Sequence, residues 1–402
     1  MKFMARNRRA AFTLFWIVSG IFFLTQCVHP ENKQTTKAVP EEKVNLSQFA
    51  GSQACAGCHK NIYDSHIHTA HYLTTRPAQV EFIKGSFQPG KNRFAYDSDR
   101  VVVMEKRDSG FYQVAYFRGD EKIAGRFDIV VGSGSKGQTY ITRYHGQLYQ
   151  LPVSYFTAAR NWANSPLYPT NPILFNRPIT SRCLECHSSL ATVLSAPNVE
   201  PESFDEKMIY GVDCEKCHGP AARHVAFQTQ NPQAGHAEFI LNPARFTKKQ
   251  NLDLCALCHS GRLQKTKPSF EFVSGDRLSD YFAIDTFPPD PDHIDVHGNQ
   301  YGLLRASQCF KMSGTMTCTT CHNPHENERG QIALFSQRCM SCHNAAHHNT
   351  CSLTASMGSS IAQNCIDCHM PRKPSQSITE LLPGHLAPTA AMIRTHLIKI
   401  YR

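Results

Sequence analysis

The chain has 402 residues, of which 41% are hydrophobic, and it carries 17 cysteines, 21 histidines and a formal net charge of +10. A length of this order usually corresponds to two or three domains. No nucleic-acid-binding motif accompanies the basic balance, so the charge does not indicate a nucleic-acid partner. The odd number of cysteines excludes a framework in which every cysteine is paired in a disulfide within the chain.

Residues 1–27 are typical of a targeting segment. They begin with four basic side chains, Lys2, Arg6, Arg8 and Arg9, and continue in an apolar run of 15 residues that is short for a membrane-spanning helix. The run ends at Leu24-Thr25-Gln26-Cys27, which resembles a lipoprotein cleavage box, so we expect a signal peptide and a lipid anchor at Cys27. An uncleaved anchor and plain secretion are the alternatives. Each places the body of the chain on the periplasmic side of a bacterial membrane, beyond a flexible polar tether at residues 28–50.

A Cys-x-x-Cys-His motif at residues 55–59 is the main feature of the next segment, residues 51–91. Two residues between the cysteines let one turn present both sulfurs to the vinyl groups of a single porphyrin, and the histidine is then held beneath the iron. The motif therefore predicts a covalently attached c-type haem with His59 as proximal ligand. His68 and His71 share a face at helical spacing, and one of them is a candidate distal ligand.

Residues 92–160, between the first and second motifs, are rich in β-branched and aromatic residues separated by Gly and Asp. This composition predicts a small antiparallel β-sheet inserted between haem sites 1 and 2. Residues 132–137 lack the full spacing of a phosphate loop, and we interpret them as a glycine-rich turn.

Six further motifs lie in residues 161–402, which we expect to form a helical multihaem domain. Zinc sites do not require a histidine directly after the second cysteine of every pair, and a disulfide framework would not need these histidines at all. The sequence therefore predicts seven c-type haems (iron protoporphyrin). The attachment cysteines are Cys55, Cys58, Cys183, Cys186, Cys214, Cys217, Cys255, Cys258, Cys318, Cys321, Cys339, Cys342, Cys365 and Cys368. The proximal histidines are His59, His187, His218, His259, His322, His343 and His369.

The predicted fold class is mainly α with much irregular coil, packed around the seven haems, and the β-sheet insertion is its exception. Porphyrins would take the place of much of the side-chain core. The 23 glycines and 23 prolines fit short helices that are joined by turns.

Fourteen histidines remain when the seven proximal ones are subtracted from 21, enough to give every iron a second imidazole. A histidine one turn from a proximal ligand stays near the same porphyrin face, so His224 and His325 would bind neighbouring haems. The candidate distal ligands are His68, His71, His224, His297, His325, His347, His385 and His396, with His236, His293 and His348 as reserves.

Two cysteines, Cys309 and Cys351, remain once the motifs and Cys27 are assigned, and we expect them to form a disulfide in an oxidising compartment. Some basic side chains near the motifs would pair with haem propionates, with ordinary solvated charge as the alternative. They are Arg177, Arg182, Arg223, Arg245, Arg305 and Lys311.

The stretches CHGPAARH, SQCFKMSGTMTCTTCHNPH, CIDCHMP and IRTHLIKIY, with the seven motifs, resemble the multihaem c-type cytochromes. That family includes pentahaem nitrite reductase, hydroxylamine oxidoreductase and octahaem tetrathionate reductase, and the resemblance covers most of residues 51–402. It implies bis-histidine haems in stacked pairs, a largely helical scaffold, electron transfer outside the cytoplasm, and His224, His325 and His396 as distal ligands. All seven motifs keep their histidine, which departs from the lysine in the catalytic motif of pentahaem nitrite reductases.

Three functions remain open. The first is an electron carrier, the second is an oxidoreductase of the nitrite, hydroxylamine or tetrathionate type at one five-coordinate haem, and the third is a subunit of a cytochrome filament or membrane complex. Enough histidines exist to close every iron and no catalytic constellation stands out, which favours the carrier. The expected partners are a membrane quinol oxidase or dehydrogenase module or another cytochrome, and the membrane itself through the N-terminal anchor.

Overall fold

The structure of the chain is a computed structural model that describes residues 44–261, 263–283, 298–347 and 350–401. The predicted targeting segment with Cys27, most of the tether, and the candidates His293, His297 and His348 lie outside these residues. No helix in the described part of the chain is long and apolar enough to span a bilayer.

The β structure expected between the first and second motifs is present, and it forms two antiparallel sheets rather than one. The first is a meander of β2 (Arg93–Ala95), β3 (Arg100–Arg107), β4 (Gly110–Phe117) and β5 (Asp120–Arg126), hydrogen-bonded in that order. Val102 and Met104 of β3 are buried on the inner face, because successive side chains of a strand point to opposite faces.

The second sheet has seven strands and recruits segments from outside the predicted insertion. Its order is β1-β6-β7-β8-β11, with β9 pairing to β7 and β10 pairing to β9. The strands are β1 (Thr75–Pro77), β6 (Ile129–Val131), β7 (Gly137–Tyr144), β8 (Gln147–Gln150), β9 (Val153–Phe156), β10 (Asn161–Asn164) and β11 (Arg177–Pro178). The turn between β6 and β7 contains Gly132 at φ +102° and Gly134 at φ +78°, which confirms the glycine-rich turn.

Trp162 of β10 lies at the centre of the largest hydrophobic core, where it is 1% exposed. The rings of Phe87, Tyr140 and Tyr155 pack around it. A Cβ at Gly85 would lie 2.0 Å from Cζ2 of Trp162, so the position admits only glycine. The core therefore depends on a close approach between a loop backbone and an indole ring.

Gln113 joins the two sheets. It is fully buried on β4, accepts a hydrogen bond from Val153 N at 2.9 Å and donates one to Val153 O at 2.6 Å. The side-chain amide of Gln113 thus satisfies both the N–H and the C=O of Val153, as the backbone of a neighbouring strand would do within a sheet.

Short helices carry most of the motifs. These helices are α2 (Ser52–Ala56), α4 (Ser181–His187), α5 (Cys214–His218), α7 (Lys248–His259), α10 (Ile332–Met340) and α12 (Cys365–His369), while the fifth motif starts in a 3₁₀ turn at Cys318–Thr320. The remaining helices are α3 (Lys60–His66), α6 (Ala222–Gln230), α8 (Gln300–Ala306), α9 (Gln308–Met312) and α11 (Thr354–Met357).

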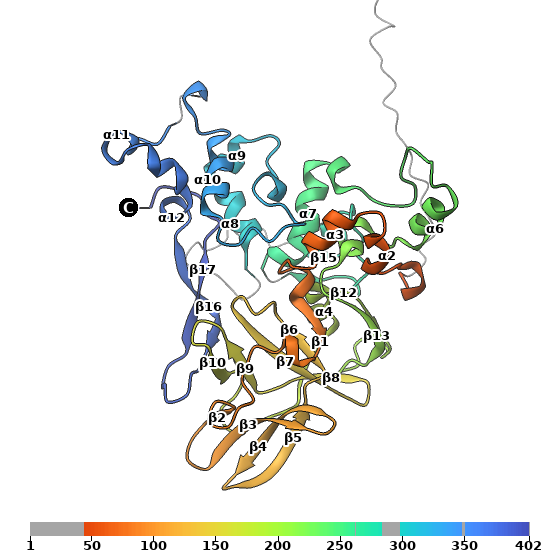
Figure 1. Cartoon of the computed structure of the whole chain (residues 1–402), viewed down its shortest axis with the longest axis vertical. Coiled ribbons are helices and arrows are strands. Elements are labelled where there is room, and N and C mark those ends of the chain that lie inside the picture. The colour runs from red at the N-terminus through yellow and green to blue at the C-terminus, as the bar shows by residue number, and fades with distance from the viewer. Residues whose placement is uncertain (1–43, 262, 284–297, 348–349, 402) are drawn as a thin grey trace, which may run out of the picture. The chain divides into compact units, whose positions relative to one another are not determined.

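The expectation of a mainly helical chain is confirmed only in part, because strands are frequent in residues 75–283 and again in residues 372–394, while the described residues between these two ranges are helical or irregular. Three two-stranded sheets lie within residues 161–402, the segment predicted to be helical. They pair β12 (Ser188–Val193) with β13 (Phe204–Tyr210), β14 (Gln264–Lys265) with β15 (Phe282–Ala283), and β16 (Arg372–Glu380) with β17 (Thr389–Arg394). Figure 1 shows the last hairpin running between the C-terminal helices and the larger sheets. Each of these sheets pairs two strands that are consecutive in the chain, so short segments between or after motifs are sufficient to form it.

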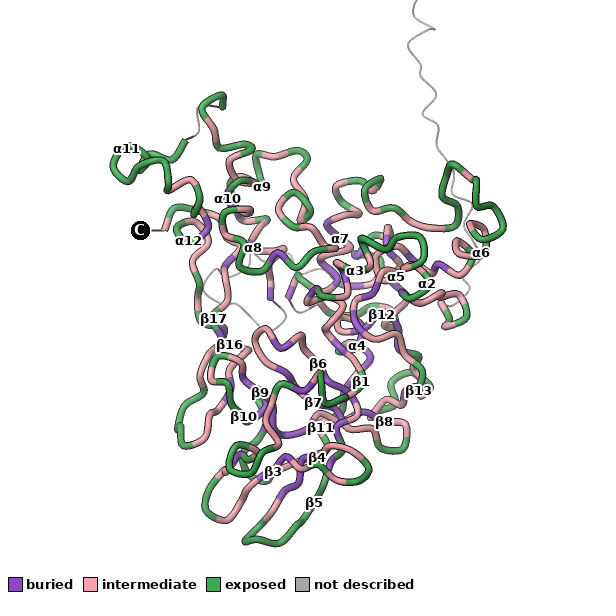
Figure 2. Tube along the Cα trace, in the orientation of Figure 1, coloured by how far each residue is buried: buried purple, intermediate pink, exposed green. Residues whose placement is uncertain are grey.

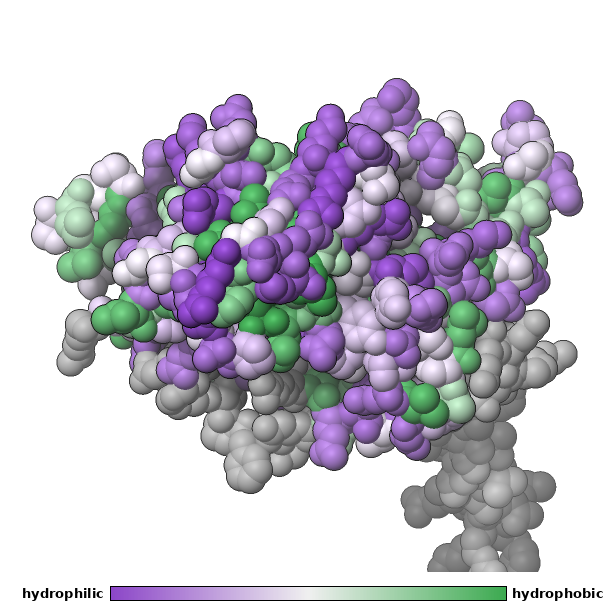
Figure 3. Space-filling model, turned by 90° about the horizontal axis from the view of Figure 1, so that it is seen from below, coloured by the Kyte–Doolittle hydropathy of each residue, from purple (hydrophilic) through white to green (hydrophobic). Residues whose placement is uncertain are grey.

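Side-chain burial is concentrated in the two large sheets, and the C-terminal part is mostly exposed or half-buried (Figure 2). Leu303, Ile366 and Ala391 are the buried hydrophobic residues within 298–347 and 350–401. A segment of roughly 100 residues with so few buried apolar side chains needs another apolar component, and covalently bound porphyrins fit that need. On the face seen in Figure 3, hydrophilic and hydrophobic residues are interspersed.

Candidate haem-binding sites

Each motif folds as a single turn that brings its histidine back over its first cysteine. In the first motif the backbone N–H of His59 donates to the backbone oxygen of Cys55 at 2.8 Å. The backbone N–H groups of His322 and His343 make the same bond to Cys318 O and Cys339 O, each at 3.0 Å. Both sulfurs and the imidazole therefore leave the backbone within one turn, as attachment to one porphyrin requires.

The structure brings three proximal histidines close to three candidate distal histidines. The ring centres are 6.1 Å apart for His71 and His259, 6.1 Å for His218 and His325, and 6.2 Å for His322 and His396. Two metal–nitrogen bonds of about 2 Å, with the radius of each ring added, place two imidazoles on opposite sides of one iron about 6 Å apart. The spacing of these pairs fits a haem iron held between two imidazoles.

His325 lies beside His218 of the third motif, although it follows His322 of the fifth motif by three residues. Ser65 Oγ donates to His325 O at 2.5 Å and holds this segment in place. This is the arrangement in which a histidine serves a neighbouring motif rather than its own.

Hydrogen bonds fix which imidazole nitrogen is available in several motifs. Nδ1 of His218 lies 2.8 Å from Leu241 O, and Nδ1 of His369 lies 3.0 Å from Lys399 O. Because a carbonyl oxygen only accepts, Nδ1 carries the proton in both rings and Nε2 keeps its lone pair for a metal. The same preparation is seen at metal-binding histidines generally.

The surroundings of His71, His259 and His396 favour the neutral form that metal ligands need. Burial, followed by the neighbouring His259, lowers the pKa of His71 to about 4. Burial, followed by the neighbouring His322, lowers the pKa of His396 to about 4 as well. Burial also lowers the pKa of His259. Neutral imidazoles in this setting are ready-made donors.

The other candidate distal histidines within the described residues are not brought into such pairs by the contacts of the structure. His224 is half-buried with Nδ1 2.8 Å from Glu238 O, and His347 is exposed with Nδ1 2.9 Å from Asn344 Oδ1. His68 and His385 are exposed, and the reserve His236 contacts Glu238 at 3.2 Å. Of the two candidates near the first motif, the geometry favours His71 over His68.

The sequence analysis did not select His66, which lies beside the paired histidine His325. It is buried, its Nε2 lies 3.1 Å from Val212 O, and its ring centre is 6.1 Å from that of His325. Its spacing of seven residues from His59, two helical turns, was the available signal.

Each of the seven motifs has a cysteine that lies near a cysteine of another motif. Three pairs of thiols from different motifs lie close enough for each to shift the pKa of the other: Cys55 with Cys214, Cys186 with Cys258, and Cys255 with Cys318. Three more pairs are close enough for their charges to interact: Cys217 with Cys255, Cys321 with Cys342, and Cys339 with Cys365. These proximities link motifs one, three, four, five, six and seven in that order, and the second motif branches off beside the fourth.

The expected disulfide is not formed. Cys309 and Cys351 are both free thiols in the structure. Cys309 is half-buried on α9, close to the attachment cysteines Cys321 and Cys339, whereas Cys351 is exposed.

Of the basic residues proposed for propionates, two are engaged by protein groups. Arg177 donates to Gln150 Oε1 at 3.0 Å and to Pro166 O at 2.9 Å, and Arg182 pairs with Glu185 at 2.7 Å. Arg223 lies over the ring of Phe239 and Arg305 over that of Tyr301. Arg245 ends a short 3₁₀ helix, and Lys311 lies in the last turn of α9.

Residues 173–219, which contain the second and third motifs, match the family model of cytochrome c554 and c-prime. With the seven motifs, this match supports a multihaem c-type cytochrome. Among solved structures, the fold is similar to that of the outer cell wall cytochrome OcwA, with a TM-score of 0.54 and 16% sequence identity over 88% of this chain and 80% of that one. No curated protein matches the chain.

Proposed function

We propose that the protein transfers electrons outside the cytoplasm by means of seven covalently attached c-type haems. The observation that carries the proposal is a set of three imidazole pairs. In each pair a histidine of a motif lies with its ring centre 6.1–6.2 Å from that of a histidine outside the motifs. Such pairs fit six-coordinate iron, which exchanges electrons without binding a substrate.

In this proposal the polypeptide sets the separation of the haems and orients their imidazole ligands. Cysteines of the first, third, fourth, fifth, sixth and seventh motifs lie near one another in that order, with the second motif beside the fourth, and a relay needs such neighbours. Imidazoles of the motifs supply the donors, and the carbonyl oxygens of Leu241 and Lys399 orient those of His218 and His369. The remaining histidines, His59, His187 and His343, would complete the seven proximal ligands.

We place the protein on the periplasmic side of a bacterial membrane, tethered through Cys27 or an uncleaved anchor, with a membrane quinol module or another cytochrome as redox partner. The covalent haem attachment that we propose agrees with this placement. The sequence of residues 1–27 is its main support.

The test is electron paramagnetic resonance of the oxidised protein, together with a mass measurement that counts haems. Seven haems, all low-spin, would support the carrier. A high-spin haem in wild-type protein, with a signal that shifts on addition of nitrite or hydroxylamine, would overturn the carrier in favour of an enzyme.

A further inference from the structure

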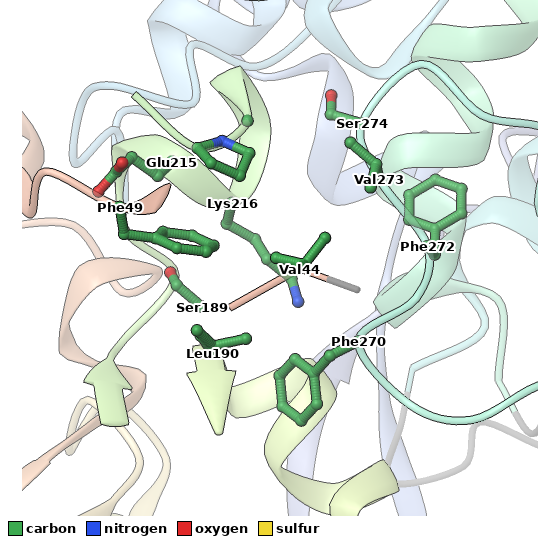
Figure 4. Close-up of a pocket in the computed structure, with 12 residues that line it drawn as sticks. Val44, Phe49, Ser189, Leu190, Glu215, Lys216, Phe270, Phe272, Val273 and Ser274 are labelled. Atoms are coloured by element: carbon green, nitrogen blue, oxygen red, sulfur yellow. The ribbon is translucent and has the colours of Figure 1, made fainter. Parts of the chain in front are cut away.

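Glu215 is a buried acid inside the third motif, between its two cysteines. The side chain is 3% exposed, and both of its oxygens accept hydrogen bonds from backbone amides. Oε1 accepts from Ala50 N at 2.9 Å and from Ala221 N at 2.7 Å, and Oε2 accepts from Gly51 N at 2.8 Å. Figure 4 shows this carboxylate directed toward the segment that carries Phe49.

These three bonds join two motifs. Ala50 and Gly51 lead directly into α2, which contains Cys55, while Ala221 follows the histidine of the third motif by three residues. The thiol of Cys55 and that of Cys214, the residue beside Glu215, lie close enough for each to shift the pKa of the other. One carboxylate therefore holds the entry of the first motif against the third.

The same device occurs between the second and fourth motifs. Glu185, also between the two cysteines of its motif, is 1% exposed and pairs with Arg182 at 2.7 Å. Arg182 donates in turn to Leu257 O at 2.8 Å, inside the fourth motif.

It occurs a third time between the fifth and sixth motifs. Arg338, directly before Cys339, donates to Cys321 O at 2.7 Å and pairs with buried Glu328. Glu328 also accepts from Asn323 N at 3.0 Å, just after the fifth motif.

We propose that Glu215, the Arg182–Glu185 pair and the Arg338–Glu328 pair are positioning residues, each of which sets the separation of two particular motifs. Charged groups with several hydrogen bonds are suited to this, because charge-assisted bonds are short and directional. The inference rests on the proposed function, since motif separation matters to a relay only if the motifs carry redox groups.

The substitution Glu215→Gln tests this with little change of shape. An amide nitrogen donates and cannot accept, so whichever position it takes, it meets a backbone N–H and at least one of the three bonds is lost. Glu206→Gln, at an exposed glutamate on β13, is the matched control. In case Glu215→Gln fails to fold, Arg338→Lys keeps the charge but loses the planar fork that contacts both Glu328 and Cys321 O, with exposed Arg329→Lys as its control.

The measurement on full-length, haem-loaded protein is the magnetic coupling between neighbouring haems in the oxidised state, with haem count and unfolding free energy beside it. We expect Glu215→Gln to keep seven low-spin haems and to lose one coupled pair, and Arg338→Lys to lose a different one, while both controls match wild type. If both variants lower only the unfolding free energy and leave every coupling intact, their role is structural and the inference is overturned. If wild-type protein carries no coupled haems, the proposed function itself fails.

Discussion

Glu380 at the end of β16 offers the sharpest test of the energetics of the fold. Its side chain is 4% exposed, and Oε2 has no hydrogen-bond partner among the described residues. Burial raises the pKa of Glu380 to about 8, whereas 4.5 is the ordinary value. The acid is therefore neutral in the folded chain at pH 7, and ionised in the unfolded chain.

The sign of the pH dependence follows from this. Between pH 4.5 and about 8 the folded chain keeps a proton that the unfolded chain has released, so this group makes the free energy of unfolding fall as the pH rises. The slope is about 1.4 kcal/mol for each pH unit, and the whole window amounts to about 5 kcal/mol. Below pH 4.5 and above about 8 the contribution is constant.

Guanidinium unfolding followed by circular dichroism, at several pH values from 4 to 9, measures this contribution. We expect Glu380→Gln, whose amide stays neutral, to gain stability relative to wild type steadily across the window. Exposed Glu326→Gln is the control and should follow wild type. If the curves of wild type and Glu380→Gln stay parallel from pH 4 to 9, the burial of an unpaired carboxyl at this position is refuted.

Three further predictions concern the ligands and the core. His71→Ala should convert one haem per chain from low-spin to high-spin in the oxidised spectrum, because it removes the partner of His259, while exposed His68→Ala should change nothing. Trp162→Ala should lower the free energy of unfolding by about 3–5 kcal/mol in chemical denaturation, because its ring fills the main core, and an unchanged midpoint would contradict that packing. Gln113→Leu should cost about 1–3 kcal/mol for each of the two Val153 backbone groups that it leaves unpaired, with Gln79→Leu, at an exposed glutamine, as the comparison.

The antiparallel sheet between the first two motifs was predictable, because alternation and β-branched residues act locally along each strand. The division of this β structure into two sheets was not predictable from local pattern. The larger sheet also takes in β1 and β11, which lie outside residues 92–160 and pair with β6 and β8. The short hairpins among the later motifs were missed for a related reason. A few residues between two haem motifs carry too little pattern to separate strand from coil, and pairing alone decides the matter.

The candidate ligands divide in the same way. Proximal histidines follow from a motif of five residues, whereas distal ones depend on segments that meet only in space. His71 approaches His259 across almost 190 residues, and His396 approaches His322 from the end of the chain. Spacing therefore ranked His71 and His396 as candidates without naming their partners, overlooked His66, and paired Cys309 with Cys351 by elimination alone.

Cysteine and histidine order along the chain was sufficient to predict seven attachment turns, because each turn is closed by its own five residues. Tertiary structure decided which turns are neighbours, which imidazoles oppose one another and which acids hold two turns together. Those relations depend on contacts between residues up to 260 positions apart, such as Ser65 with His325, and no local pattern encodes them.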